Sequence, residues 1–206
     1  MSSYGSLLAQ DARGDWRGEP GEHRVAELGR EATIDDLHTV RGKAEIAGGK
    51  LVLIGPSGCA PATAAGHILV SLSWYEDERA GGYALASRVA YVVDLPNRRS
   101  LCPDASWWTG APGGAGFLTG APAFAAEVRD ERDYGSAADE HAAAKRADYF
   151  AAGTLVVWDV DVLREEVVRV YRATEPDTPV IYHRGEMAEA EPAVPGWRFP
   201  VDRLWL

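Results

Sequence analysis

The stretch APAFAAEVRDERDYGSAADEHAAAKRADYF, residues 121–150, joins an apolar segment to a helix-forming segment. Its first part, APAFAAEV, predicts a buried strand that carries one carboxylate, Glu127, near its end. Its second part, continued to Gly153, predicts a helix that presents Lys145. A carboxylate is costly to bury unless a cation pairs with it. The pattern therefore raises the question of whether a metal ion or Lys145 shares the charge of Glu127.

The segments around this stretch predict an α/β (or α+β) domain whose mixed β-sheet is flanked by helices. Thr33 and Asp36 form a capping-box pattern at the start of a short helix, and Gly48-Gly49 is typical of a tight hairpin turn. The predicted elements are a helix over 33–40, a hairpin over 43–55, a helix over 61–80, strands over 83–95, 98–108 and 154–162, an antiparallel pair over 165–173 and 179–185, and an aromatic tail over 194–206 that packs onto the domain.

The chain has 206 residues, enough for one domain with a substantial core. Residues 1–30 predict a flexible N-terminal extension, and residues 31–206 predict a single domain. The sequence contains no apolar run as long as a membrane span, and its start lacks the pattern of a secretory signal. Cys59 and Cys102 are too few for a disulfide framework and are expected to be buried in a reducing compartment. We therefore expect a cytoplasmic protein without a membrane partner.

The net charge of −10 bears on possible partners. An acidic chain of this kind argues against a broad basic surface for non-specific binding of nucleic acid. It leaves open a local basic groove, and it leaves open a carboxylate site that recruits divalent cations.

Four charged residues lie where strands and helices are otherwise apolar: Glu45, Asp104, Glu127 and Lys145. Three carboxylates and one lysine can hold Mg²⁺ and orient a water molecule for attack on a phosphodiester. His141 and Tyr149 stand four residues to either side of Lys145, so all three are expected on one helix face and in one cleft. This set is the candidate site.

Three members of the set also have a simpler interpretation. Glu45 could face solvent on an amphipathic hairpin, Asp104 could be a turn residue after a proline, and Lys145 could lie on a solvated helix face. A second carboxylate pair, Asp159 and Asp161, points to one face of its strand. That pair could imitate a metal site, or it could mark the end of the strand and the following turn.

Taken in order, the motifs CPDASWW, APAFAAEV and AAAKRADYFAAGTLVVWDVD resemble those of the Uma-type ("Uma two") family of restriction endonucleases, a bacterial branch of the PD-(D/E)XK nuclease superfamily. Upstream, TIDDLHTVRGKAEIAGGKLVLIGPSG is similar to the opening helix and hairpin of that family. The resemblance extends from about Thr33 to the end of the chain. It implies a restriction-endonuclease-like mixed sheet flanked by helices.

The resemblance also implies roles for the candidate residues. Asp104 and Glu127 would bind the metal ion, Mg²⁺ or Mn²⁺, together with Val128, which directly follows Glu127. Lys145 would be the catalytic lysine and Glu45 an accessory acidic residue. DNA would be the substrate, and a homodimer is expected because cutting both strands takes two active sites.

The chain departs from the family pattern in two ways. It has Ala123 where the family strand usually has an aspartate after its proline. Lys145 follows Glu127 by 18 residues, a little more than is usual in the family. The alternative is therefore a non-catalytic interaction or regulatory protein that retains the nuclease fold. The acidic balance of the chain and Ala123 favour this alternative, and cleavage assays with Mg²⁺ or Mn²⁺ would separate the two.

Overall fold

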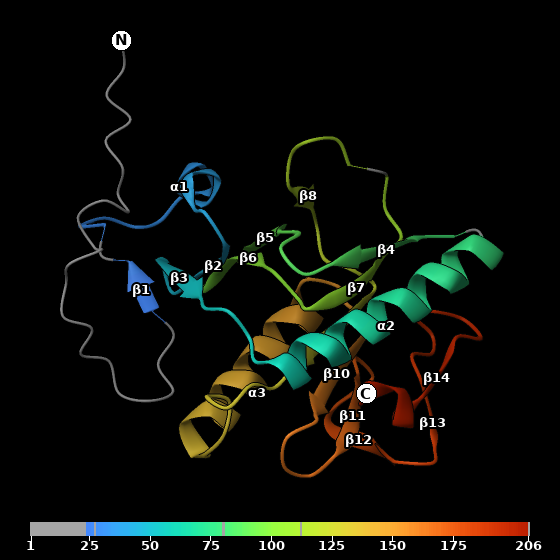
Figure 1. Cartoon of the computed structure of the whole chain (residues 1–206). Coiled ribbons are helices and arrows are strands. Elements are labelled where there is room, and N and C mark those ends of the chain that lie inside the picture. Colours follow the sequence, from blue (N-terminus) through green and yellow to red (C-terminus); the bar gives the residue numbers. More distant parts are fainter. Residues whose placement is uncertain (1–23, 27, 80, 112, 206) are drawn as a thin grey trace.

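The structure of the protein is a computed structural model that describes residues 24–26, 28–79, 81–111 and 113–205. Two six-stranded sheets form its centre (Figure 1). In spatial order, the first sheet contains β1 (Arg24–Ala26), β3 (Lys50–Ile54), β2 (Lys43–Ala47), β6 (Arg98–Leu101), β5 (Tyr91–Leu95) and β8 (Leu118–Thr119). The second contains β12 (Glu175–His183), β11 (Val167–Arg172), β10 (Val156–Asp161), β9 (Phe124–Val128), β7 (Ala105–Trp108) and β4 (Tyr83–Ala86).

Both sheets are mixed, because β9 runs parallel to β10 and β5 runs parallel to β8, whereas the other pairs are antiparallel. The α/β class with a mixed sheet is thus confirmed. The expectation of one sheet is corrected to two, and a small third sheet pairs β13 (Met187–Glu189) with β14 (Arg198–Pro200).

Three α-helices flank the sheets in the described part of the chain: α1 (Ile34–Thr39), α2 (Cys59–Glu78) and α3 (Ser136–Ala151). All three were expected from the sequence. The Thr33 N–H donates to the Asp36 carboxylate at 2.8 Å, which caps the start of α1. Positive φ angles at Gly48 (57°) and Gly49 (71°) form the tight turn between β2 and β3, as the Gly-Gly pair predicts.

Helices α2 and α3 cover opposite faces of the second sheet, and the alternation along β9 decides what each helix meets. Phe124, Ala126 and Val128 pack in the cluster that includes α2, whereas Ala125 packs in the cluster that includes α3. Since successive side chains of a strand point to opposite faces, Glu127 points toward α3. The apolar run therefore places the Glu127 carboxylate on the sheet face that α3 covers, and α3 is the helix that carries Lys145.

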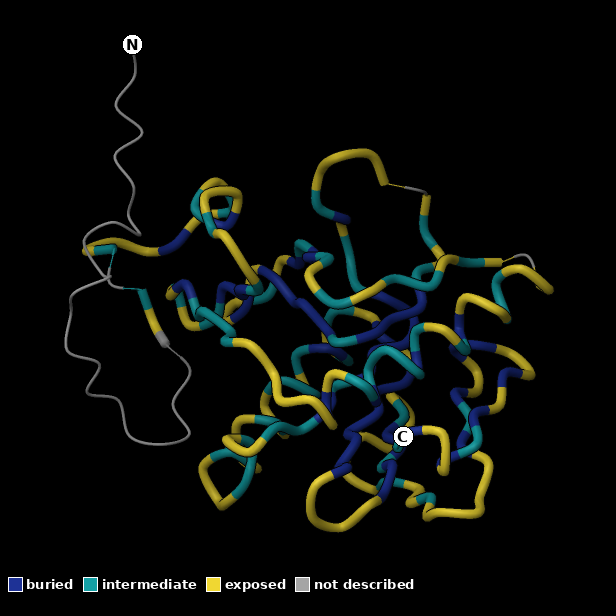
Figure 2. Tube along the Cα trace, in the orientation of Figure 1, coloured by how far each residue is buried: buried dark blue, intermediate teal, exposed yellow. Residues whose placement is uncertain are grey.

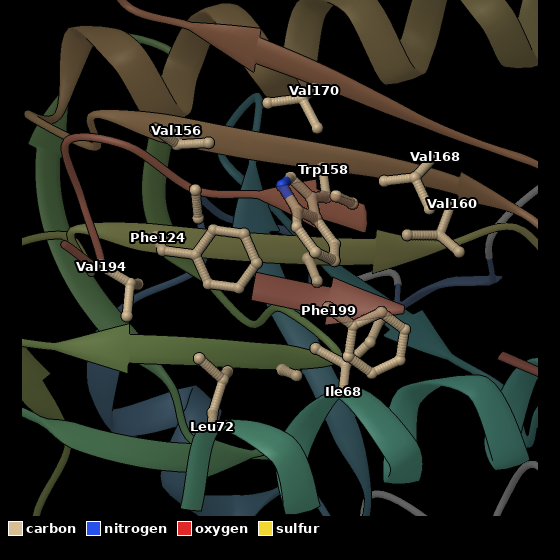
Figure 3. Close-up of a cluster of buried hydrophobic side chains, with 14 of the residues drawn as sticks. Ile68, Leu72, Phe124, Val156, Trp158, Val160, Val168, Val170, Val194 and Phe199 are labelled. Carbon is tan, nitrogen blue, oxygen red and sulfur yellow. The ribbon is translucent and has the colours of Figure 1, made fainter. Parts of the chain in front are cut away.

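The main core lies on the α2 side of the second sheet (Figure 3). Trp158 of β10 packs edge-on against Phe124, with ring centroids 5.2 Å apart, and stacks on Trp197 of the C-terminal tail at 5.0 Å. Phe199 of the tail is fully buried beside them. The expected packing of the tail is confirmed. In the two sheets, buried residues concentrate in the inner strands (Figure 2).

The predicted extension over residues 1–30 lies mostly outside the described residues, and its described part includes β1, which pairs antiparallel with β3. Cys102 is buried, whereas Cys59 is exposed at the first residue of α2, contrary to the expectation that both cysteines are buried. Within the described ranges, none of the helices has the length and apolar character needed to cross a membrane.

Candidate active site

A pocket of about 490 Å³ opens where the two sheets and α3 meet. Its lining includes all four candidate residues, which come from four different places in the fold: Glu45 from β2, Asp104 from the passage between β6 and β7, Glu127 from β9, and Lys145 from α3. The residues that the sequence analysis grouped by chemistry are therefore brought together in space.

Lys145 makes the central contacts of the pocket. Its Nζ atom lies 2.8 Å from Glu127 Oε1 and 2.9 Å from Glu45 Oε1, and its side chain is 14% exposed. The interpretation of Lys145 as a solvated surface residue is therefore wrong. His141 and Tyr149, one turn to either side on α3, line the same pocket, as their spacing predicts.

Glu127 is held from one side and open on the other. The hydroxyl of the fully buried Tyr149 donates to Glu127 Oε1 at 2.6 Å, beside the Lys145 ammonium. Among the described residues, the hydrogen bond from Tyr149 and the contact with Lys145 both go to Glu127 Oε1, and the side chain lines the pocket and is 27% exposed. A ligand in the pocket would therefore meet Oε2.

Glu45 is buried, so the interpretation of it as a solvent-facing hairpin residue is also wrong. Its Oε1 accepts the Cys102 N–H at 2.8 Å in addition to its contact with Lys145, and its Oε2 accepts from Arg98 at 2.8 Å. Arg98 in turn donates to Asp148 of α3 at 2.6 Å. Glu45 thus connects the first sheet to α3 and orients the Lys145 amine.

Asp104 lies where the chain leaves the first sheet and enters the second. Its backbone N–H donates to the Ala126 carbonyl at 2.9 Å, which continues the antiparallel pairing of β7 with β9 and places Asp104 opposite Glu127. Its Oδ2 accepts the Val128 N–H at 2.9 Å, and its Oδ1 contacts Lys43 Nζ at 2.6 Å. Asp104 therefore lies directly before β7, the strand next to β9, and not on a strand itself as expected, but it is still opposite Glu127.

Burial and neighbouring charges shift the pKa values of two groups in the pocket, Glu127 and Lys145. Burial raises the pKa of the Glu127 carboxyl, and the nearby Lys145 and Lys43 offset only part of that effect. Burial would lower the pKa of Lys145, but the charges of Glu127 and Glu45 outweigh it, so the pKa lies above its ordinary value. Lys145 is therefore a protonated cation at neutral pH.

The donor atoms that this pocket offers are of the type that a hard divalent cation prefers. Asp104 and Glu127 offer carboxylate oxygens, and Mg²⁺ is commonly bound through one or two carboxylates with water completing its coordination. Among residues 24–26, 28–79, 81–111 and 113–205, no group of three or more histidine, cysteine, aspartate or glutamate side chains is placed to hold a metal ion. Val128 could contribute only its carbonyl oxygen, because its hydrocarbon side chain carries no ligand atom and is buried in the main core.

The structure adds cations that sequence reasoning missed. Lys43 and Arg98 both contact candidate carboxylates. Lys43 stands two residues before Glu45, so the period of a strand puts both on one face, and this signal could have identified it. Arg98 gave no such signal, because its contact with Glu45 spans 53 residues of the chain.

The carboxylates of the second pair, Asp159 and Asp161, are held by contacts within the fold. Asp159 accepts two hydrogen bonds from the Arg129 guanidinium, at 2.6 and 2.7 Å. Asp161 accepts from the Tyr134 hydroxyl and from the backbone N–H groups of Leu163 and Arg164. The interpretation of Asp161 as the end of the strand and start of a turn is confirmed.

This architecture is a restriction-endonuclease-like α/β fold, and it is shared with a solved structure. A crystal structure described as "a putative nuclease belonging to DUF820 from Anabaena variabilis ATCC 29413" matches with a TM-score of 0.66 over 84% of this chain and 97% of that chain. The two are 14% identical, so the likeness concerns the fold alone. Residues 34–202 match the Uma2 family, described as "Putative restriction endonuclease", and the chain belongs to this family. Among curated proteins, none matches the chain.

Proposed function

We propose that this protein is a metal-dependent endonuclease that hydrolyses phosphodiester bonds in DNA. The observation that carries the proposal is the contact of Lys145 Nζ with Glu127 at 2.8 Å. It joins a helix and a strand in a pocket that Asp104 also lines. A lysine and two carboxylates in one pocket form a set suited to phosphodiester hydrolysis.

In this proposal Asp104 and Glu127 would hold Mg²⁺ or Mn²⁺, and the Val128 carbonyl could add a third oxygen. When bound, the ion would polarise the phosphate and lower the pKa of a coordinated water molecule. Lys145 carries a positive charge, which suits it to stabilise the negative charge that develops on the phosphate and makes it a poor base. Glu45 keeps the amine in place as a positioning residue.

The charge of the chain limits how DNA would bind. A net charge of −10 repels a polyanion at long range, so affinity must come from cations near the pocket. Arg129, Arg132 and Arg146 line the pocket together with Lys43 and Lys145. We expect weak, strongly salt-dependent binding of DNA. We also expect the active form to be a homodimer, because a double-strand cut takes two sites; light scattering of the purified protein tests this.

The test is cleavage of supercoiled plasmid, linear duplex and single-stranded DNA with Mg²⁺ or Mn²⁺. Cleavage that disappears with a chelator and in Asp104→Asn supports the proposal. A protein that binds Mn²⁺ but cuts none of these forms overturns it and leaves the second candidate, a non-catalytic interaction protein. That candidate is favoured by one observation: each of the three carboxylates already has a cationic partner within the protein.

A further inference from the structure

Lys43 occupies a position in the pocket to which the proposed nuclease chemistry gives no role in holding the metal or in catalysis. It is the first residue of β2, and its Nζ lies 2.6 Å from Asp104 Oδ1. Its side chain is only 12% exposed, although a lysine at a strand end can usually extend its amine into water. The lysine is therefore directed inward, onto a carboxylate that the proposed function assigns to the metal.

The centre of the pocket gives each of its carboxylates a cationic partner without a metal ion, although Arg98 is shared with Asp148 of α3. Its three carboxylates, Glu45, Asp104 and Glu127, stand against three cations. The cations are Arg98, Lys43 and Lys145, and each of them contacts at least one of the carboxylates. A protein site that depends on a divalent cation is more often left with excess negative charge, which the cation then neutralises. Here the protein supplies that positive charge itself.

Lys43 holds one proposed metal ligand and stands in the same pocket as the other. Its Nζ lies 2.6 Å from Asp104 Oδ1, and it lines the pocket together with Glu127, which lies opposite Asp104 in the register of the strands. A cation in contact with Asp104 occupies the position at that carboxylate that a divalent ion would take. An ammonium and a divalent cation at the same carboxylate oxygen repel one another, so the two are alternatives.

We propose that Lys43 is an internal counterion that holds Asp104 in the metal-free protein and that must leave Asp104 before a divalent cation binds. This inference rests on the proposed function, since it takes Asp104 and Glu127 as the metal ligands. It implies that the wild-type protein binds metal weakly and that the departing amine remains within the pocket. There it becomes a positive charge available to a phosphate group.

The experiment titrates Mn²⁺ into DNA-free protein by calorimetry at neutral pH. Lys43→Met removes the charge and keeps most of the side-chain volume, and we expect it to bind Mn²⁺ about tenfold or more tightly than the wild type. Lys50→Met is the matched control: it removes the same charge from the exposed far end of the same hairpin and should bind Mn²⁺ as the wild type does. Equal or weaker binding by Lys43→Met overturns the inference.

Thermal unfolding provides a second readout. In chelator, Lys43→Met should unfold at a lower temperature than the wild type, because Asp104 loses its counterion, and saturating Mn²⁺ should stabilise the variant more than the wild type. If Lys43→Met does not fold, Lys43→Arg replaces it. That variant keeps the charge and should bind Mn²⁺ no more tightly than the wild type, and tighter binding overturns the inference.

The outcomes separate this inference from the proposed function. If the affinities follow the expected order but no form of DNA is cut, the counterion role stands and the nuclease proposal falls. If DNA is cut but Lys43→Met and the wild type bind Mn²⁺ equally, the inference alone falls. If neither protein binds Mn²⁺, both fall.

Discussion

Lys145 and Glu127 are separated by 18 residues along the chain, yet Lys145 Nζ lies 2.8 Å from Glu127 Oε1. The same amine also lies 2.9 Å from Glu45 of the first sheet. One ammonium therefore joins β2, β9 and α3. Because these contacts are buried or nearly so, the candidate site is also part of what holds the helix on the two sheets.

Replacing Lys145 tests its catalytic role. Lys145→Met keeps the aliphatic stem but removes the cation, so we expect cleavage to fall by about 100-fold or more while Mn²⁺ still binds. The variant should also lose roughly 1–3 kcal/mol of folding stability, because two carboxylates lose a partner. Plasmid cleavage and urea unfolding measure the two effects.

The control for this substitution is the exposed Lys50, whose change to methionine should leave cleavage and stability close to wild type. Wild-type cleavage by Lys145→Met would remove the lysine from the mechanism. The non-catalytic interpretation of the contact would then be the one to pursue.

Glu127→Gln should abolish binding of divalent cations and slightly stabilise the metal-free protein. Burial raises the pKa of Glu127, so the wild type loses stability as the pH rises from the ordinary value of 4.5 through the raised value. Glutamine cannot ionise and lacks this loss, so at neutral pH the variant should melt higher, by roughly 2–4 °C for each kcal/mol gained. Calorimetry in which both proteins bind Mn²⁺ equally would rule out a metal role for Glu127.

Local patterns predicted much of the fold because each has a local physical cause. The capping of α1 by Asp36, the turn at Gly48-Gly49 and the end of α3 before Gly153 all depend on residues close in sequence. The period of two along β9 also sets which residues face α3. Alternation and helical spacing therefore predict which residues share a face, whereas the pairing of Glu127 with Lys145 was an expectation from the family resemblance.

The division into two sheets had no such local cause. Residues 98–108 read as one extended segment, but Pro103 separates β6 of one sheet from β7 of the other. Residues 83–95 likewise divide into β4 and β5 around Arg88, which adopts a φ of 82°. The contact between Lys43 and Asp104 spans 61 residues, and a single sequence does not specify such a pairing.

Tyr149→Phe tests how Glu127 is positioned. The hydroxyl donates to Glu127 Oε1 at 2.6 Å, and hydrogen bonds to charged groups contribute roughly 1.5–3 kcal/mol. We expect a stability loss of about that size, weaker Mn²⁺ binding and slower cleavage. Tyr91→Phe is the matched control, because the Tyr91 hydroxyl is also buried but pairs with Ser106 at 2.8 Å, outside the pocket. If both variants slow cleavage equally, the effect of Tyr149 reflects stability and not the site.

Glu45 should make the protein sensitive to acid in a defined range of pH. Burial would raise the pKa of Glu45, but the charges of Lys145 and Arg98 outweigh it and lower the pKa to about 2 from the ordinary value of 4.5. A carboxyl group with a lowered pKa stabilises the fold above its unfolded value, and this stabilisation is lost as the pH falls from 4.5 through about 2. At about 1.4 kcal/mol per pKa unit, the contribution at neutral pH is on the order of 3 kcal/mol.

Glu45→Gln should therefore be less stable than the wild type at neutral pH, and the difference should shrink as the pH falls through that range. Urea unfolding at a series of pH values measures the difference directly, and the exposed Glu78→Gln on α2 is the control that should follow the wild type. A constant difference between Glu45→Gln and the wild type from pH 2 to 7 would mean that lost packing, and not the charge of Glu45 beside Lys145 and Arg98, accounts for its contribution.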